Sequence, residues 1–215
     1  MTYTRERPSP RYERLLAQYR QLHEQGDART GESPDQVFPG KSLAPQAHHV
    51  RRLIERHRAR TILDYGSGKG TQYLPLPFTD REGRAYPDIR AYWGGVEIRC
   101  YDPAYGPHSG LPAGRFGGVI ATDVLEHVPE DDMEWVVEEL FRFAERFVFA
   151  NVACYSANRI LPSGANAHCT VQPLKWWRRL VESVARRHAT IDYEFRLQES
   201  RSDPGKVLAK ALSDA

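Results

Sequence analysis

The stretch ILDYGSGKG, residues 62–70, joins a short apolar run to one acidic residue and three alternating glycines. The apolar run, taken from Thr61 to Tyr65, predicts a short buried strand. Glycines directly after such a strand allow a tight turn whose bare backbone can approach a ligand. The stretch therefore predicts a ligand site at the end of a strand.

Two common glycine loops do not fit this stretch. A phosphate-binding P-loop needs the pattern GxxxxGK[ST], whereas Lys69 is followed here by Gly70 and position 63 is Leu. The dinucleotide pattern GxGxxG needs a glycine where this chain has Thr71. A nicotinamide-dependent oxidoreductase is therefore disfavoured, and it stays an alternative that a test of NAD binding would separate.

Length and composition favour one substantial domain. The chain has 215 residues, of which 40% are hydrophobic, and this is enough for a single core. The 30 basic and 28 acidic residues give a net charge of +2, too small to indicate a polyanionic partner. The longest apolar stretches are far shorter than the ~20 residues of a membrane helix. We therefore expect a soluble protein that does not contact a membrane.

The cysteines indicate a reducing compartment. Cys100, Cys154 and Cys169 are odd in number, form no CxxC pair and follow no signal-peptide pattern. Such a set is typical of reduced thiols in the cytoplasm, and no metal site follows from it. We therefore expect a cytoplasmic protein.

Alternating strand and helix patterns predict an α/β fold with a doubly wound, mostly parallel sheet covered by helices on both faces. The expected strands are 61–65, 96–101, 118–122, 147–151, 190–197 and 206–211. The expected helices are 11–25, 42–58 with Ser42 as its N-cap, 131–144 and 173–187. A short helix and an irregular insertion are expected between Thr71 and Gly95, and such an insertion often lies over a site.

The pattern Asp64-x-Gly66-x-Gly68-x-Gly70 after a strand resembles motif I of the class I S-adenosylmethionine (SAM) dependent methyltransferases. The string DVLEH at residues 123–127 resembles the fourth-strand signature of the same family. The resemblance covers about residues 48–197. It implies the Rossmann-like class I methyltransferase fold, with SAM as cofactor. We accordingly divide the chain into an N-terminal helical extension, 1–42, and a SAM-binding domain, 43–215.

The resemblance also implies roles for individual residues. Asp64 would accept a hydrogen bond from the methionine ammonium, and the small glycines would leave room for the ligand at the edge of the sheet. Asp102, at the end of the next strand, would accept the ribose hydroxyls, with Pro103 and Tyr105 beside the adenine. Asp123 would face the cofactor or the acceptor. The full predicted cofactor set is Asp64, Gly66, Ser67, Gly68, Gly70, Asp102, Pro103, Asp123, Val124 and Leu125.

The predicted catalytic residues are His168 and Asp123. His168 lies in the loop NRILPSGANAHCTVQPLKWW, residues 158–177. The loop comes after the predicted strand 147–151, which corresponds to the fifth strand of the family, where acceptor-binding loops of this fold commonly lie. An imidazole titrates near neutral pH and could orient or deprotonate an acceptor; a purely structural role for His168 is weighted equally. Glu126 and His127 are expected to satisfy backbone groups at a helix entry rather than to act in catalysis. No metal ligands are predicted.

The implied reaction is an SN2 transfer of a methyl group from SAM to an oxygen or nitrogen of a small-molecule acceptor, enclosed by residues 12–45, 72–95 and 155–170. Alternatives stay open: a SAM-using transferase of another group, a non-catalytic SAM-binding module, or a nucleic-acid base methyltransferase. The last has weak support from arginine clusters and from Asp102-Pro103-Ala104-Tyr105, which resembles the D-P-P-Y motif of adenine methyltransferases but follows the wrong strand. The sequence does not indicate the oligomeric state.

Overall fold

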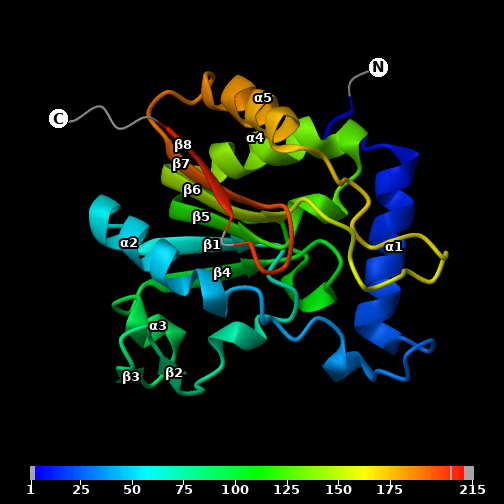
Figure 1. Cartoon of the computed structure of the whole chain (residues 1–215), viewed down its shortest axis with the longest axis horizontal. Helices are drawn as coiled ribbons and strands as arrows, with labels where there is room; N and C mark the ends of the chain where they lie inside the picture. Colours follow the sequence, from blue (N-terminus) through cyan, green and yellow to red (C-terminus); the bar gives the residue numbers. More distant parts are fainter. Residues whose placement is uncertain (1–2, 204, 211–215) are drawn as a thin grey trace.

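The computed structural model describes residues 3–203 and 205–210, and its centre is a six-stranded sheet (Figure 1). The strands are β1 (Thr61–Tyr65), β4 (Glu97–Tyr101), β5 (Phe116–Thr122), β6 (Ala144–Ala153), β7 (Asp192–Gln198) and β8 (Lys206–Ala209). They follow the order β4-β1-β5-β6-β7-β8, and β8 pairs antiparallel with β7 while the other pairs are parallel. The predicted α/β fold with a mostly parallel sheet is confirmed.

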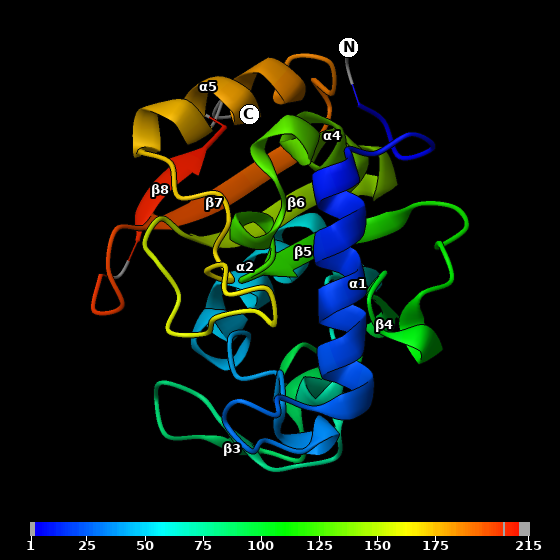
Figure 2. The same cartoon turned by 90° about the vertical axis from the view of Figure 1, so that its right-hand side faces the viewer.

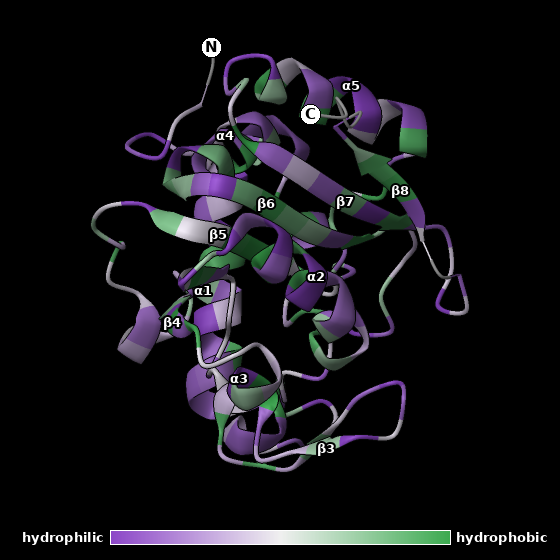
Figure 3. Cartoon of the chain, turned by 90° about the vertical axis from the view of Figure 1, so that its left-hand side faces the viewer, coloured by the Kyte–Doolittle hydropathy of each residue, from purple (hydrophilic) through white to green (hydrophobic). Residues whose placement is uncertain are grey.

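Helices cover both faces of this sheet, and Figure 1 shows α4 and α5 on one face and α2 on the other. The helices are α1 (Pro10–Gln25), α2 (Ala47–His57), α3 (Ile89–Tyr92), α4 (Met133–Phe143) and α5 (Leu174–Ala185). Two apolar cores result, one between α4, α5 and the sheet and one between α2 and the sheet. Figure 3 shows hydrophobic colours along β5 and β6 and hydrophilic colours on the outer side of α2, as a buried sheet and a covering helix require.

The N-terminal segment is held to the sheet domain by buried polar contacts. Arg5 pairs with Glu139 and donates hydrogen bonds to the hydroxyls of Tyr65 and Tyr101, at 3.1 and 3.0 Å. The backbone N–H of Ser9 donates to a carboxylate oxygen of Asp132 at 2.9 Å. The Ser9 hydroxyl also caps the first turn of α1. These contacts fix α1 across the carboxyl ends of the strands (Figure 2).

The predicted N-cap at Ser42 is wrong. Pro45 lies in a separate 3-10 turn, Ala44–Gln46, and α2 begins only at Ala47. The Ser42 hydroxyl instead donates a hydrogen bond to the backbone carbonyl of Thr122 at 3.3 Å. Proline is favoured in the first turn of a helix, because the N–H that it lacks would have no partner there. Pro45 therefore fits the 3-10 turn that precedes α2.

The insertion after the glycine loop, between Thr71 and Gly95, is more regular than expected. It contains a 3-10 turn, Thr71–Tyr73, a two-stranded hairpin of β2 (Phe78–Thr79) and β3 (Ala85–Tyr86), and then α3. Trp93 after α3 donates its indole N–H to the carbonyl of Ala47 at 2.9 Å. The insertion thus packs beside α2, in the second core.

The strand before DVLEH is β5, and it is the third strand of the main sheet in chain order rather than the fourth. Residues 103–115, with three prolines and three glycines, form a 3-10 turn and loop instead of a strand. The last predicted strand, 206–211, is β8 up to Ala209, and residue 211 lies outside the described residues.

Two further features of the described residues concern the cysteines and the possibility of a membrane-spanning helix. The thiols of Cys100, Cys154 and Cys169 are free and half-buried. Within residues 3–203 and 205–210, no helix combines the length and the apolar character that crossing a membrane requires. Trp177, a residue of α5, is fully buried in the core between α4, α5 and the sheet.

Gly118 tests the packing of the central strands. A Cβ on Gly118 would come within 2.2 Å of the ring of Phe147, a fully buried residue of β6. We expect Gly118→Ala to lower the free energy of unfolding by about 1–3 kcal/mol, because the ring has no free space to enter. Gly106→Ala is the control, since a Cβ there meets open space. Equal urea midpoints for the two variants would contradict this packing.

Candidate functional site

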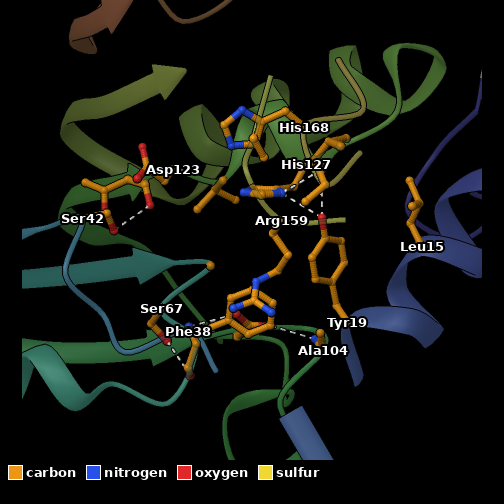
Figure 4. A pocket seen from close by; sticks show the side chains of 18 of the residues that line it. Leu15, Tyr19, Phe38, Ser42, Ser67, Ala104, Asp123, His127, Arg159 and His168 are labelled. Carbon is orange, nitrogen blue, oxygen red and sulfur yellow. Dashed lines mark hydrogen bonds between the residues drawn. The ribbon is translucent and has the colours of Figure 1, made fainter. Parts of the chain in front are cut away.

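A cavity of about 600 Å³ opens at the carboxyl ends of β1, β4 and β5 (Figure 4). The chain continues from β1 to β4 on one side and then to β5 on the other, so that the strand order reverses at this edge. Crevices at such a reversal are the usual ligand sites of open α/β sheets, and the volume suits a cofactor-sized molecule. The predicted site at the end of β1 therefore coincides with a real cavity.

The glycine loop after β1 forms one wall of this cavity. The N–H groups of Gly66 and Ser67 donate to the carbonyl of Tyr101 at 2.7 and 3.1 Å, which turns the loop over the end of β4. Gly66 has φ +80°, and a Cβ there would come within 2.4 Å of a methyl group of Val124. Gly66, Ser67, Gly68 and Val124 all line the cavity, as predicted. Only glycine fits the position where the two loops meet.

Asp102 lies beside this loop and also lines the cavity. Its two carboxylate oxygens accept hydrogen bonds from the N–H of Gly68 at 2.9 Å and the N–H of Ala104 at 2.8 Å. Burial raises the pKa of this carboxyl, and these backbone donors oppose the shift. Pro103 lines the cavity as expected, whereas Tyr105 packs against His23 with 5.2 Å between ring centroids. The aromatic wall predicted at Tyr105 is therefore replaced by Pro103 and Ala104.

Asp64 lies behind the cavity wall, although the sequence predicted a direct contact with a ligand. One of its carboxylate oxygens accepts hydrogen bonds from the amide of Gln72 at 2.8 Å and the hydroxyl of Tyr73 at 2.9 Å. Burial raises the pKa of Asp64 to about 6, against the lowering effect of those two donors. Gln72 lines the cavity, and its side-chain oxygen is buried with no hydrogen-bond partner among the described residues. Asp64 thus positions Gln72.

Two other predicted cofactor residues also stand back from the cavity. Gly70 has φ +67°, and a Cβ there would meet the thiol of Cys100 and the ring of His108, each at 3.1 Å. Leu125 is fully buried in the core shared with α4 and α5. Gly70 and Leu125 therefore shape the loops that carry the wall without forming it.

Asp123, the first residue after β5, projects into the cavity (Figure 4). Its side chain is in contact with solvent in the cavity. The surrounding protein partly removes water from its carboxyl and so raises the pKa of that group. Asn151 holds it from two sides, because its amide donates to the carboxylate at 2.9 Å and its carbonyl accepts the Asp123 N–H at 3.1 Å. The backbone has φ +54°, a left-handed conformation that Asp tolerates better than most residues. Strained positions of this kind are often functional.

Two histidines form the opposite end of the cavity (Figure 4). The Nδ1 atom of His168 lies 2.5 Å from the carbonyl oxygen of Tyr155, and the ring centroids of His127 and His168 are 4.9 Å apart. The Nδ1 atom of His127 lies 2.9 Å from the carbonyl of Ala167 and 2.7 Å from the hydroxyl of Tyr19. Burial lowers the pKa of both imidazoles, that of His127 to about 3, so both are neutral at pH 7.

Glu126, between these groups in sequence, is fully buried. One carboxylate oxygen accepts the N–H of Ala153 at 2.9 Å, which fits the structural role expected for it. Burial, followed by the charge of Asp123, raises the pKa of this carboxyl.

Helix α1 and the loop after β6 close the remaining sides of the cavity, and they lie in segments 12–45 and 155–170, which the sequence predicted to enclose an acceptor. Tyr19 and His23 face the cavity from α1, together with Leu15. Arg159 lines it from the β6 loop and is ion-paired with Asp27 and Glu32 at 2.8 Å each. Of the three segments expected to enclose an acceptor, 12–45 and 155–170 contribute several lining residues, whereas 72–95 contributes only Gln72.

Neither a scan against protein-family models nor a search of curated proteins finds a match for this chain. The geometry and chemistry of the cavity therefore carry the functional argument.

Asp64 gives a pH test of the site. Its carboxyl has a pKa of about 6 in the folded protein against 3.8 as a free group, so the contribution of Asp64 to stability is fully present below pH 3.8 and is lost as the pH rises through 6. Asp64→Asn removes this titration. Each pH unit between the two pKa values is worth about 1.4 kcal/mol, so the variant should gain about 3 kcal/mol relative to wild type between pH 3.5 and 7.

Urea unfolding across this pH range measures the difference. Asp131→Asn, at an exposed aspartate, serves as the control. A difference between wild type and Asp64→Asn that stays constant with pH would show that folding does not shift the pKa of Asp64.

Proposed function

We propose that this protein binds SAM and transfers its methyl group to an oxygen or nitrogen atom of a small-molecule acceptor. The observation that carries the proposal is the convergence of three chain segments on one cavity: the bare backbone of Gly66 to Gly68, the carboxylate of Asp102 and the carboxylate of Asp123. These groups match the chemical needs of SAM, which has no phosphate but has a ribose, an ammonium and a sulfonium.

The cofactor end is the part built by β1 and β4. Asp102 is suited to the ribose hydroxyls because a carboxylate oxygen keeps a second acceptor position after binding one backbone N–H. Gln72 is suited to the methionine ammonium because its buried side-chain oxygen has no hydrogen-bond partner in the described part of the chain. Pro103 and Ala104 would flank the adenine. Asp64 accepts a hydrogen bond from the Gln72 amide and would so hold Gln72 in position at the ammonium site.

The acceptor end is the part built by α1, DVLEH and the loop after β6. His127 and His168 are neutral and can accept a hydrogen bond from an acceptor hydroxyl or amine. Tyr19 and Leu15 supply an aromatic and an aliphatic wall from α1. Asp123 lies between the two ends and is suited to orient the reacting groups (Figure 4).

SAM would supply an electrophilic methyl group on a sulfonium, and the protein would hold this methyl group and the acceptor atom in line. Holding two reactants in line can account for several kcal/mol of barrier lowering without a strong base. His168 would accept the acceptor proton where the nucleophile has to lose it.

The observed charge pairing does not favour a nucleic-acid acceptor. The arginines of α2 that could form a basic face are paired with acidic side chains: Arg51 with Glu55, and Arg52 with Glu194. Paired arginines offer less positive potential to phosphates than free ones. A small acceptor also suits a cavity that α1 covers.

Asp102 provides the test of the cofactor end. We expect Asp102→Ala to weaken SAM binding roughly tenfold or more, because hydrogen bonds to a charged group are worth about 1.5 kcal/mol or more. Glu97→Ala, at the other end of the same strand and exposed, is the matched control. Calorimetric titration with SAM measures both variants. Wild-type affinity in Asp102→Ala would remove the ribose assignment.

His168 provides the test of the acceptor end. We expect His168→Ala to keep SAM affinity within about twofold and to lower turnover by a factor of roughly 100 or more, as loss of an acid–base group does. Release of S-adenosylhomocysteine in an acceptor screen measures turnover. His188→Ala is the control, because His188 pairs with Glu138 away from the cavity. Equal turnover in the two variants would assign His168 a structural role only.

A further inference from the structure

Glu126, His127 and His168 form a cluster at the acceptor end of the cavity, where the two histidines line the wall and Glu126 is buried behind them. One ring nitrogen of each histidine and one carboxylate oxygen of Glu126 all lie within 4.8 Å of one another. Two of the residues follow β5, and the third comes from the loop after β6, so tertiary folding rather than local sequence brings them together. Figure 4 shows the two histidines side by side.

The hydrogen bonds of the two histidines fix which nitrogen is available. The Nδ1 atoms of His168 and His127 face the carbonyl oxygens of Tyr155 and Ala167, at 2.5 and 2.9 Å. A carbonyl can only accept, so the Nδ1 of His168 carries the proton and its Nε2 keeps a lone pair. The Tyr19 hydroxyl, 2.7 Å from the Nδ1 of His127, donates its own proton to the carbonyl of Ala167, so the same tautomer follows for His127. A ring N–H donated to a backbone carbonyl is the usual second contact of a metal-binding histidine.

The buried carboxylate of Glu126 gives a second, independent indication of a bound cation. Its side chain is fully buried, one carboxylate oxygen accepts the Ala153 N–H, and the other has no hydrogen-bond partner among residues 3–203 and 205–210. A buried carboxylate oxygen without a partner is costly unless a cation or a proton satisfies it. Asp123 adds a second carboxylate that interacts with both Glu126 and His168.

We propose that His127, His168 and Glu126 bind one divalent transition-metal ion at the acceptor end of the cavity. Two imidazole nitrogens and one carboxylate oxygen form a ligand set that suits zinc and other first-row divalent ions. Three protein ligands leave coordination positions for water or for an oxygen atom of the acceptor.

Ion binding requires a small closure of the cluster. Metal–ligand bonds of about 2.1 Å place the ligand atoms roughly 3 to 4 Å apart. The three ligand atoms lie within 4.8 Å of one another, so side-chain movements of up to about an ångström would complete the site. The metal site does not depend on the proposed methyl transfer. With an ion bound at its Nε2, His168 would hold the ion beside the acceptor and would not itself accept the acceptor proton. The metal site revises the sequence-based expectation that no metal ligands are present, which treated Glu126 and His127 as backbone partners only.

Cobalt(II) is a suitable probe because it replaces zinc and gives a visible d–d absorption that reports its ligands. The full, untagged chain is first treated with a chelator and then titrated with Co²⁺ without SAM. Metal content is measured in parallel by mass spectrometry after dialysis against Zn²⁺. We expect one equivalent of metal per chain, and a visible spectrum that saturates at that ratio.

Variants test the ligands. His168→Ala and Glu126→Gln should each weaken Co²⁺ binding at least tenfold, whereas His48→Ala should bind as wild type does. His48 and His49 form the control pair, because their rings are 3.6 Å apart on α2, outside the cavity. Circular dichroism confirms that each variant is folded, and Glu126→Gln keeps the shape of the buried side chain.

Two results would overturn the proposal. Wild-type protein that takes up no stoichiometric metal would show that a proton, not a metal ion, satisfies Glu126. Metal uptake that His48→Ala removes and His168→Ala leaves intact would place the ion on α2. Neither result bears on SAM binding, which the calorimetric titration measures separately.

Discussion

The carbonyl oxygen of Tyr101 accepts hydrogen bonds from the N–H groups of both Gly66 and Ser67, and the position of the cavity depends on this junction between β1 and β4. The junction turns the glycine loop away from the sheet and brings Gly68 to the carboxylate of Asp102. It also brings Gly66 against Val124, so the loops after β1 and β5 meet without a side chain between them. Three strand ends therefore share one space.

The N-terminal segment makes this open sheet edge into an enclosed site. Arg5 and Ser9 anchor the segment through Glu139 and Asp132. From that anchor α1 crosses the strand ends, and the Tyr19 hydroxyl reaches both His127 and the carbonyl of Ala167 (Figure 2). Two segments more than 100 residues apart in sequence thus meet at the acceptor end, where the histidines and Glu126 lie.

The parts of the site that the sequence predicts are those set by local rules. A short apolar run followed by glycines indicated the loop after β1, and acidic residues at strand ends indicated Asp102 and Asp123. The sheet itself follows from alternating patterns, because a parallel sheet needs covered faces on both sides. His168 was indicated by a polar, glycine-containing loop at the right edge of the sheet.

The rest depends on tertiary contacts that no local pattern contains. β1 is buried on both faces, so the sequence does not distinguish an Asp64 that faces the cavity from one that binds Gln72 and Tyr73 behind it. The sequence predicted that segment 12–45 would enclose an acceptor, but the apolar stripe of α1 did not indicate which of its side chains would face the cavity. His127 was interpreted as a structural residue because a polar pair at a helix entry commonly satisfies backbone groups. The sequence does not show that His168, 41 positions later in the chain, is its neighbour in space.

The central claim is that the cavity at the ends of β1, β4 and β5 is a SAM site. A calorimetric titration of the wild-type protein with SAM and S-adenosylhomocysteine, with NADH in a parallel cell, tests it most directly. The account predicts one site per chain with dissociation constants of roughly micromolar size for both SAM-derived ligands and no heat from NADH. Absence of binding to SAM and S-adenosylhomocysteine, or binding to NADH alone, would contradict it.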